Sequence, residues 1–179
     1  MTDTQLKTFL DTFTHSGTGD VKRELFIIFG RKGNTGDFIP LGYKQESAAI
    51  ENNYNENSVR DVLGQVYNDI ISKDEQISMS EYHNNPSASP FLDTAWMYTL
   101  AGLESELEDY ELLMVSAWLV NESGEFFARN VSGVRLKLDN MGGQSYTMAD
   151  VTFSGISRGK FGTVSSLSKP EFKENVPTA

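Results

Sequence analysis

The last third of the chain has the clearest alternation of apolar and polar residues. Residues 134–138 read Val-Arg-Leu-Lys-Leu, a turn with two glycines follows at 139–143, and residues 145–157 alternate again. A period of two residues is that of a β-strand with one buried face. The pattern therefore predicts two strands joined by a turn, and residues 160–166 predict one strand more.

Continuous apolar runs predict buried strands earlier in the chain. Residues 24–31 form such a run, a polar Gly-rich turn follows at 32–37, and the apolar pattern resumes at 38–41. Residues 112–120 form the longest mostly apolar run. Runs of this length that are rich in β-branched and aromatic residues are typical of strands.

A polar hairpin is predicted in the middle of the chain. It follows residues 42–59, which are polar and are expected to be extended or looped and mostly exposed to solvent. Its two strand-like runs, 62–71 and 76–82, flank a turn at 72–75. The second run has one apolar and one polar face, with Ile77 and Met79 alternating with Ser78, Ser80 and Tyr82. Because one side can pack while the other meets water, we expect this hairpin to contact other subunits rather than to belong to the core.

One helix is predicted with start and stop signals of its own. Ser89 can cap it, Pro90 suits the first helical position, and Gly102 can end it. Residues 91–101 carry its apolar stripe. We expect Trp96 to be its core anchor, buried together with Phe91, Leu92 and Leu100.

The sequence has no internal repeat or linker, so we expect a single domain over residues 1–179. Residues 1–22 and 168–179 are expected to be terminal arms. In the first arm, a spacing of three and four residues allows a short amphipathic helix, formed by Leu6, Phe9, Leu10 and Phe13.

Charge is distributed unevenly. The chain has 179 residues and a formal net charge of −10, while residues 37–111 alone carry a net −12. Residues 1–36 carry a net +1 and residues 123–179 a net +2. An acidic surface argues against a basic nucleic-acid-binding domain. The asymmetry suits copies that meet head to tail with opposite signs facing, although a one-sided field on a monomer gives the same count.

The chain contains no cysteine, which excludes disulfides, thiolate metal sites and a cysteine nucleophile. Its first residues lack the basic stretch followed by an apolar stretch that is typical of a secretory leader. Its longest apolar run is far shorter than the roughly 20 residues that span a bilayer. We therefore expect a soluble protein, made in a cytoplasm.

No assembled set of catalytic residues is evident. His15 and His83 lie in polar contexts, and no serine sits in a Gly-x-Ser-x-Gly elbow. The Gly-rich residues 30–36 lack the Gly-Lys-Ser/Thr ending of a phosphate loop, and the acidic residues 104–111 lack EF-hand spacing. We expect no enzymatic activity, no cofactor and no metal site.

The order of these features resembles the major tail tube proteins of long-tailed bacteriophages. The residues that carry the resemblance are Asp61-Val62-Leu63-Gly64-Gln65-Val66-Tyr67 running into Ile77-Ser78-Met79-Ser80, the helix from Phe91 to Gly102, and Phe153-Ser154-Gly155-Ile156 turning at Arg158-Gly159 into Phe161-Gly162-Thr163-Val164. The resemblance covers roughly residues 24–167.

This resemblance implies a mainly β fold, namely a barrel-like two-sheet β-sandwich with one packed α-helix and a protruding polar β-hairpin. It implies subunits that close into hexameric rings and combine their strands into a continuous lumen barrel. The rings would stack head to tail around a tape-measure protein, end at tail-terminal proteins and conduct the genome DNA, without specific binding, in the tail of a virion.

An acidic lumen would repel DNA phosphates, which agrees with the acidic middle segment. Our candidates for the lumen wall and for contacts between subunits are Glu46, Glu51, Glu56, Asp69, Asp74, Glu75, Ser78 and Ser80.

Two alternatives remain open. One is the tube of a related machine, either a contractile tail or the haemolysin-coregulated tube of type VI secretion. The other is a monomeric β-sandwich that binds carbohydrate through exposed aromatic faces, for which Tyr43, Tyr54, Tyr67 and Tyr82 are candidates.

Overall fold

A computed structural model describes residues 1–33, 35–41, 48–60, 63, 65–88, 90–103 and 107–175, with the backbone alone described at 23, 55–60, 66–72 and 91. Within these residues the chain forms two α-helices, α1 (Asp3–Leu10) and α2 (Pro90–Leu100), and a short 3₁₀ helix at Arg23–Leu25. The strands are β1 (Phe13–His15), β2 (Phe26–Lys32), β3 (Ile39–Pro40), β4 (Ala48–Arg60), β5 (Val66–His83), β6 (Tyr110–Asn121), β7 (Phe126–Gly142), β8 (Met148–Ile156), β9 (Lys160–Val164) and β10 (Phe172–Glu174).

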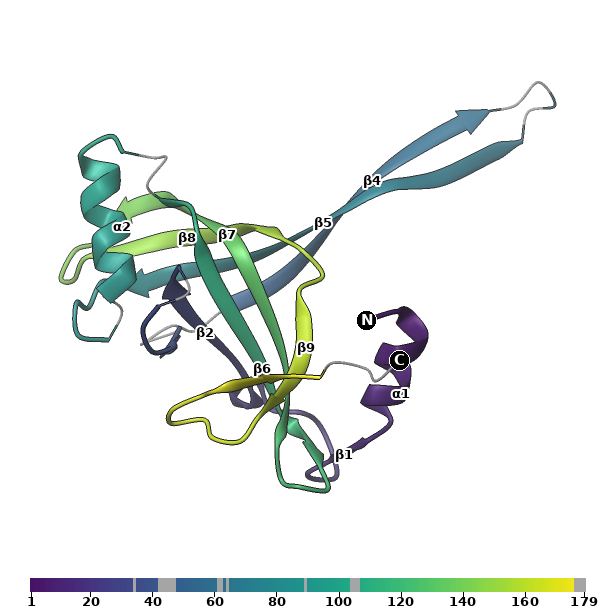
Figure 1. Ribbon diagram of the computed structural model, residues 1–179. Coiled ribbons are helices and arrows are strands. Elements are labelled where there is room, and N and C mark those ends of the chain that lie inside the picture. Colours follow the sequence, from purple (N-terminus) through teal and green to yellow (C-terminus); the bar gives the residue numbers. More distant parts are fainter. Residues whose placement is uncertain are drawn as a thin grey trace.

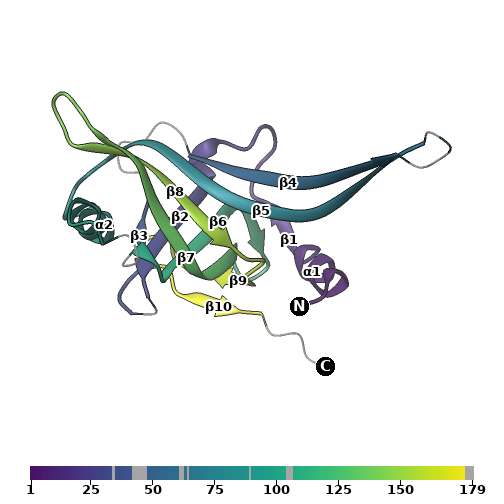
Figure 2. The same cartoon turned by 90° about the horizontal axis from the view of Figure 1, so that it is seen from above.

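The strands form two sheets that share the long strand β7. In sheet A, the first part of β7 pairs with β6 and β9, and β1, β2, β3 and β10 extend that sheet. From Arg135 onward β7 pairs with β8, and sheet B has the order β7-β8-β5-β4. Figures 1 and 2 show sheet B passing across sheet A. The path through the sheets is open, so the expected resemblance to a barrel is not present within the described chain.

The core lies between the two sheets. Leu112 and Val131 of sheet A and Ile77 and Phe153 of sheet B belong to one buried cluster. Each of these side chains is at most 1% exposed. Burial of this kind is the main favourable contribution to folding. The expected mainly β fold with a packed helix is confirmed.

Helix α2 begins at Pro90, as the sequence predicts, and ends in a Schellman motif at Gly102 (φ 74°). The Gly102 N–H donates to the Thr99 carbonyl at 3.0 Å, and the Leu103 N–H donates to the Tyr98 carbonyl at 2.8 Å. This arrangement satisfies carbonyls of the last turn and needs a residue that tolerates positive φ.

The buried face of α2 differs from the one that we expected. Leu92 and Ala95 are buried in the core, Trp96 is only half-buried against it, and Leu100 is 68% exposed. At 3.6 residues per turn, Leu100 lies about 80° around the helix from Leu92, which turns it away from the core. The side chain of Phe91 lies outside the described residues.

The hairpin is built from other strands than predicted. Strand β5 runs without a break from Val66 to His83, straight through the expected turn at 72–75, and pairs with β4. Strand β4 ends at Arg60, and β5 begins at Val66. Strand β4 was missed because its asparagine-rich sequence has no apolar period, and pairing with β5 alone determines its conformation.

Tyr82 points into the core, although the alternation of residues 77–82 predicts the opposite face. A register shift between Met79 and Tyr82 interrupts the pairing of β5 with β8, and Glu81 at this point has φ 54°. Such a bulge inserts one extra residue and reverses the alternation beyond it. Tyr82 is accordingly only 1% exposed. Ile77 and Met79, on the same face, are almost fully buried too.

Helix α1 is held at the surface by a capping box and an aromatic cluster. The Thr2 N–H donates to Gln5 Oε1 at 2.8 Å, and the Gln5 N–H donates to Thr2 Oγ1 at 3.3 Å. Phe9 contacts both Phe13 and Phe127, with ring centroids 5.1 and 6.0 Å apart. The helix has no buried residue, so these rings are its main apolar attachment.

Candidate functional site

The most unusual feature is a two-stranded ribbon that leaves the sandwich (Figure 1). We define the ribbon as residues 53–60 of β4 and 66–74 of β5, which pair with each other. Strand β5 pairs with β8 only from Glu75 to His83, and β4 pairs with β5 alone among the described strands. At about 3.4 Å per residue the ribbon reaches roughly 30 Å. An isolated two-stranded ribbon is at best marginally stable in water. This ribbon is therefore suited to pairing with another chain.

A clamp around Arg129 of β7 holds the root of the ribbon. Its Nη1 donates to Oε1 of Glu75 at 2.6 Å, and both side chains are largely buried. Its Nη2 and Nε donate to the carbonyls of Ser157 and Arg158 at 2.6 and 2.9 Å. The guanidinium therefore joins β5, β7 and the turn after β8.

The structure brings part of the predicted acidic set onto the outer face of sheet B. Glu51 and Asp74 are exposed there, because they are adjacent in sequence to Ile50 and Glu75, which face the sandwich side. Glu75 is bound to Arg129 and adds no uncompensated charge. Ser80 is exposed and Ser78 is half-buried on the outer face.

Three other predicted residues lie partly or wholly outside the described residues. The backbones of Glu56 and Asp69 lie in the ribbon, opposite Ile70 and Asn57 respectively, and their side chains lie outside the described residues. Glu46 also lies outside the described residues.

The opposite edge of sheet B carries two bases, each paired with a neighbouring carboxylate. Arg135 and Lys137 of β7 are exposed, while their neighbours Leu136 and Leu138 face the core. Arg135 Nη2 lies 2.7 Å from Glu108 Oε1, and Lys137 Nζ lies 2.5 Å from Asp139 Oδ1. The strict alternation of residues 134–138 shows in the sequence that both bases share a face, but not which strand lies across the sheet from them.

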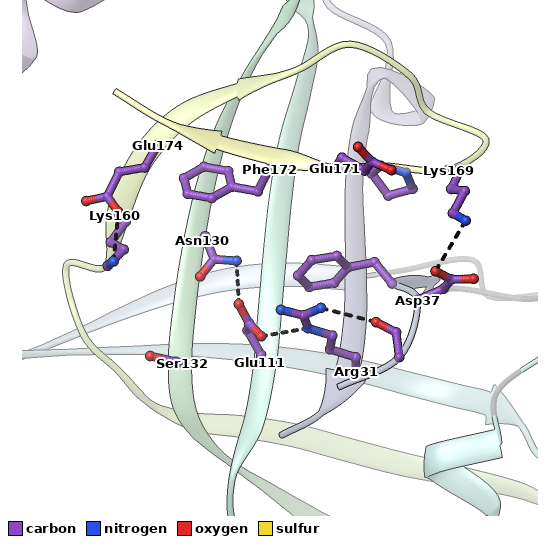
Figure 3. Close-up of a pocket in the computed structure, with 13 residues that line it drawn as sticks. Arg31, Asp37, Glu111, Asn130, Ser132, Lys160, Lys169, Glu171, Phe172 and Glu174 are labelled. Atoms are coloured by element: carbon purple, nitrogen blue, oxygen red, sulfur yellow. Dashed lines mark hydrogen bonds and ion pairs between the residues drawn. The ribbon is translucent and has the colours of Figure 1, made fainter. Parts of the chain in front are cut away.

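A hollow lies beneath the C-terminal segment, on the outer side of sheet A (Figure 3). Its volume is about 620 Å³. Buried Glu111 accepts from Arg31 Nε at 2.6 Å and from Asn130 Nδ2 at 2.7 Å. The Arg31 guanidinium also donates to the Gly36 carbonyl at 3.1 Å and stacks over Phe38. Sequence reasoning missed this network because its residues are far apart in the chain.

This hollow has the chemistry of a structural polar cluster. Both oxygens of Glu111 accept hydrogen bonds, and the ion pair with Arg31 balances its charge. Ion pairs hold the segment above it, with Lys160 Nζ 2.7 Å from Glu174 and Lys173 Nζ 2.7 Å from Glu125. Hydrogen bonds from Lys173 and Thr163 lower the pKa of Glu125.

The described residues contain no group of three or more His, Asp or Glu side chains that could hold a metal ion. Within the same residues, no helix has the length and apolar character needed to cross a membrane.

One of the proposed carbohydrate-stacking residues is unavailable for that role, because Tyr82 is buried. Tyr54 is 52% exposed, while Tyr43 and the side chain of Tyr67 lie outside the described residues.

No protein-family model and no curated protein matches the chain. Among solved structures it is similar to the anti-feeding prophage cap, described as a tube-terminating cap, with 17% identity, a TM-score of 0.46 and coverage of 84% of this chain and 95% of the other. It is also similar to a chain from the sheath–tube complex of the PVC extracellular contractile injection system in the extended state (14% identity, TM-score 0.48, coverage 92% and 99%). A chain from the sheath/tube terminator of that system shows 16% identity, a TM-score of 0.47 and coverage of 80% and 97%. At this level of similarity the three matches identify neither a family nor an activity.

Proposed function

We propose that this chain is a non-enzymatic structural subunit that assembles with copies of itself into the tube of a tail-like injection apparatus. In its specific form, the proposal is a tail tube of hexameric rings, stacked head to tail around a tape-measure protein and closed by tail-terminal proteins. The tube would conduct the genome DNA from the virion into the host, in whose cytoplasm the subunit is made.

The observation that carries this proposal is the ribbon. Its residues 66–74 pair on one side only, and so does β4, within the described chain. Open strand edges of this length are a template for pairing with another chain. A monomer gains no core from the ribbon, whereas an assembly gains a continuous sheet.

The outer face of sheet B is the proposed channel wall. Its described residues are polar, with carboxylates at Glu51, Asp74 and Asp150 and bases at Arg135 and Lys137. A wall that offers hydrated polar groups and few bases gives DNA phosphates no strong binding site.

Negative-stain microscopy and sedimentation over a range of protein concentrations test the proposal. We expect rings or tubes that grow with concentration. A chain that remains a small particle at every concentration would contradict the proposal, and so would turnover of a substrate by the purified protein.

A shortened variant tests the role of the ribbon itself. Asn52 and Glu75 are opposite one another, so residues 53–74 can be replaced by an Asn-Gly turn that keeps both strand roots. Because Ile77, Met79 and Tyr82 remain, we expect a cooperatively folded chain that forms no rings. Normal assembly of this variant would show that the ribbon is dispensable.

A further inference from the structure

Sheet B ends in two open strands that run in opposite directions. Every neighbouring pair in the order β7-β8-β5-β4 is antiparallel. Strand β4 therefore runs antiparallel to β7. If a second copy lies beside the first in the same orientation, its β7 meets β4 as an antiparallel partner, which continues the pattern of the sheet.

The β7 edge is hollowed as well as open. From Arg135 to Gly142, β7 pairs with β8 and with no other described strand. A hollow of about 420 Å³ follows this edge and is bounded by Thr99, Leu107, Glu108, Leu136 and Leu138. The hollow leaves room for an incoming strand between β7 and the end of α2.

The two edges match on the side that faces the core. Ile50 lies opposite Ile77, yet it is 38% exposed, and β5 is the only described strand that pairs with β4. Tyr54, four residues farther along β4 on the same side, is 52% exposed. Leu107 and Leu138 line the hollow at the other edge. Joining the edges would bring these apolar side chains together.

The two edges also match on the outer side, through opposite charge. Glu51 is exposed on β4, and Arg135 and Lys137 are exposed on β7, all on the outer face of sheet B. Arg135 and Lys137 now pair with Glu108 and Asp139, whose side chains are 52% and 33% exposed. Surface pairs of this kind contribute little, so exchanging them for a partner on a second copy costs little.

We propose that residues 48–53 of β4 in one copy dock along residues 135–140 of β7 in a second copy, which places Ile50 opposite Leu138 and Glu51 opposite Lys137. The apolar residues close the hollow, and Glu51 faces Arg135 and Lys137. The contact joins two different surfaces, so it leaves one free edge at each end and propagates until a ring closes. This inference rests on the proposed function, because it names the surfaces through which the subunits associate.

Charge reversal tests the contact. Variant one is Glu51→Lys, and variant two is Arg135→Glu with Lys137→Glu. The matched control, Lys22→Glu with Lys169→Glu, makes the same charge change as variant two at exposed positions outside sheet B. Sedimentation and negative-stain microscopy measure assembly, and circular dichroism measures folding.

We expect each edge variant alone to need about tenfold more protein to assemble, because like charges then face each other. An equimolar mixture of the two should assemble near the wild-type concentration, since each altered edge then meets its complement. The control should resemble the wild type.

The failures are distinguishable. A wild-type chain that never assembles overturns both the proposed function and this inference. A wild type that assembles, together with edge variants that behave like the control, overturns this inference alone. Edge variants that fail alone and stay unassembled when mixed also overturn it, because the charges then act elsewhere.

Discussion

The backbone N–H of Glu81 donates to Oδ1 of Asp150 at 2.8 Å, and this contact supports the bulge that turns Tyr82 into the core. Glu81 holds φ 54° there, in the left-handed region. The bulge separates the part of β5 that follows the expected alternation from the part that reverses it.

The bulge predicts an unusual response at Glu81. Glu81→Gly should preserve stability, because glycine tolerates positive φ, whereas Glu81→Val should cost about 1 kcal/mol, because a β-branched side chain fits positive φ less well than glutamate does. Urea denaturation measures both. Ser78→Val, at a neighbouring position with extended backbone, is the control and should have little effect; an equal loss there would assign the effect to the valine rather than to φ.

Helix α2 offers a matched pair of leucines. Leu92→Ala should cost about 2–5 kcal/mol because the side chain is buried, and Leu100→Ala should stay within about 0.5 kcal/mol because it is exposed. Trp96→Ala should fall between them. Comparable losses at both leucines, measured by denaturant unfolding, would contradict the observed orientation of the helix.

The Arg129 clamp should stabilise the root of the ribbon. Arg129→Ala leaves Glu75 and two carbonyls without their donor, and we expect a loss of about 3 kcal/mol. Arg158→Ala removes the exposed pair with Asp3 and should cost less than about 1 kcal/mol. Thermal unfolding of both variants separates a clamp from an ordinary surface pair.

Tyr110 should make the fold sensitive to alkali. Burial, and after it the nearby Tyr98, raise the pKa of Tyr110 to about 12. Since an unfolded tyrosine ionises near pH 10, the stabilising effect is complete below that pH and is lost as the pH rises towards 12. The free energy of unfolding of Tyr110→Phe should therefore fall less steeply over this interval than that of the wild type. Parallel curves would mean that other groups cause the alkaline loss.

The sequence by itself determined the elements whose apolar residues recur at a regular period or whose ends carry strong local signals. The sequence predicts strands β2, β6 and β8 and the bounds of α2. Their apolar patterns and capping signals are carried by residues close together in the chain. The sequence also determined that residues 135 and 137 share a face.

Only the tertiary structure decided the pairing of β4 with β5, the inward turn of Tyr82 and the Arg129–Glu75 clamp. No side chain described in the asparagine-rich strand β4 is fully buried, so its sequence shows no apolar period. A bulge depends on the register between strands, and an ion pair between residues 54 positions apart depends on how the sheets meet. These features arise from long-range contacts, which local propensity does not encode.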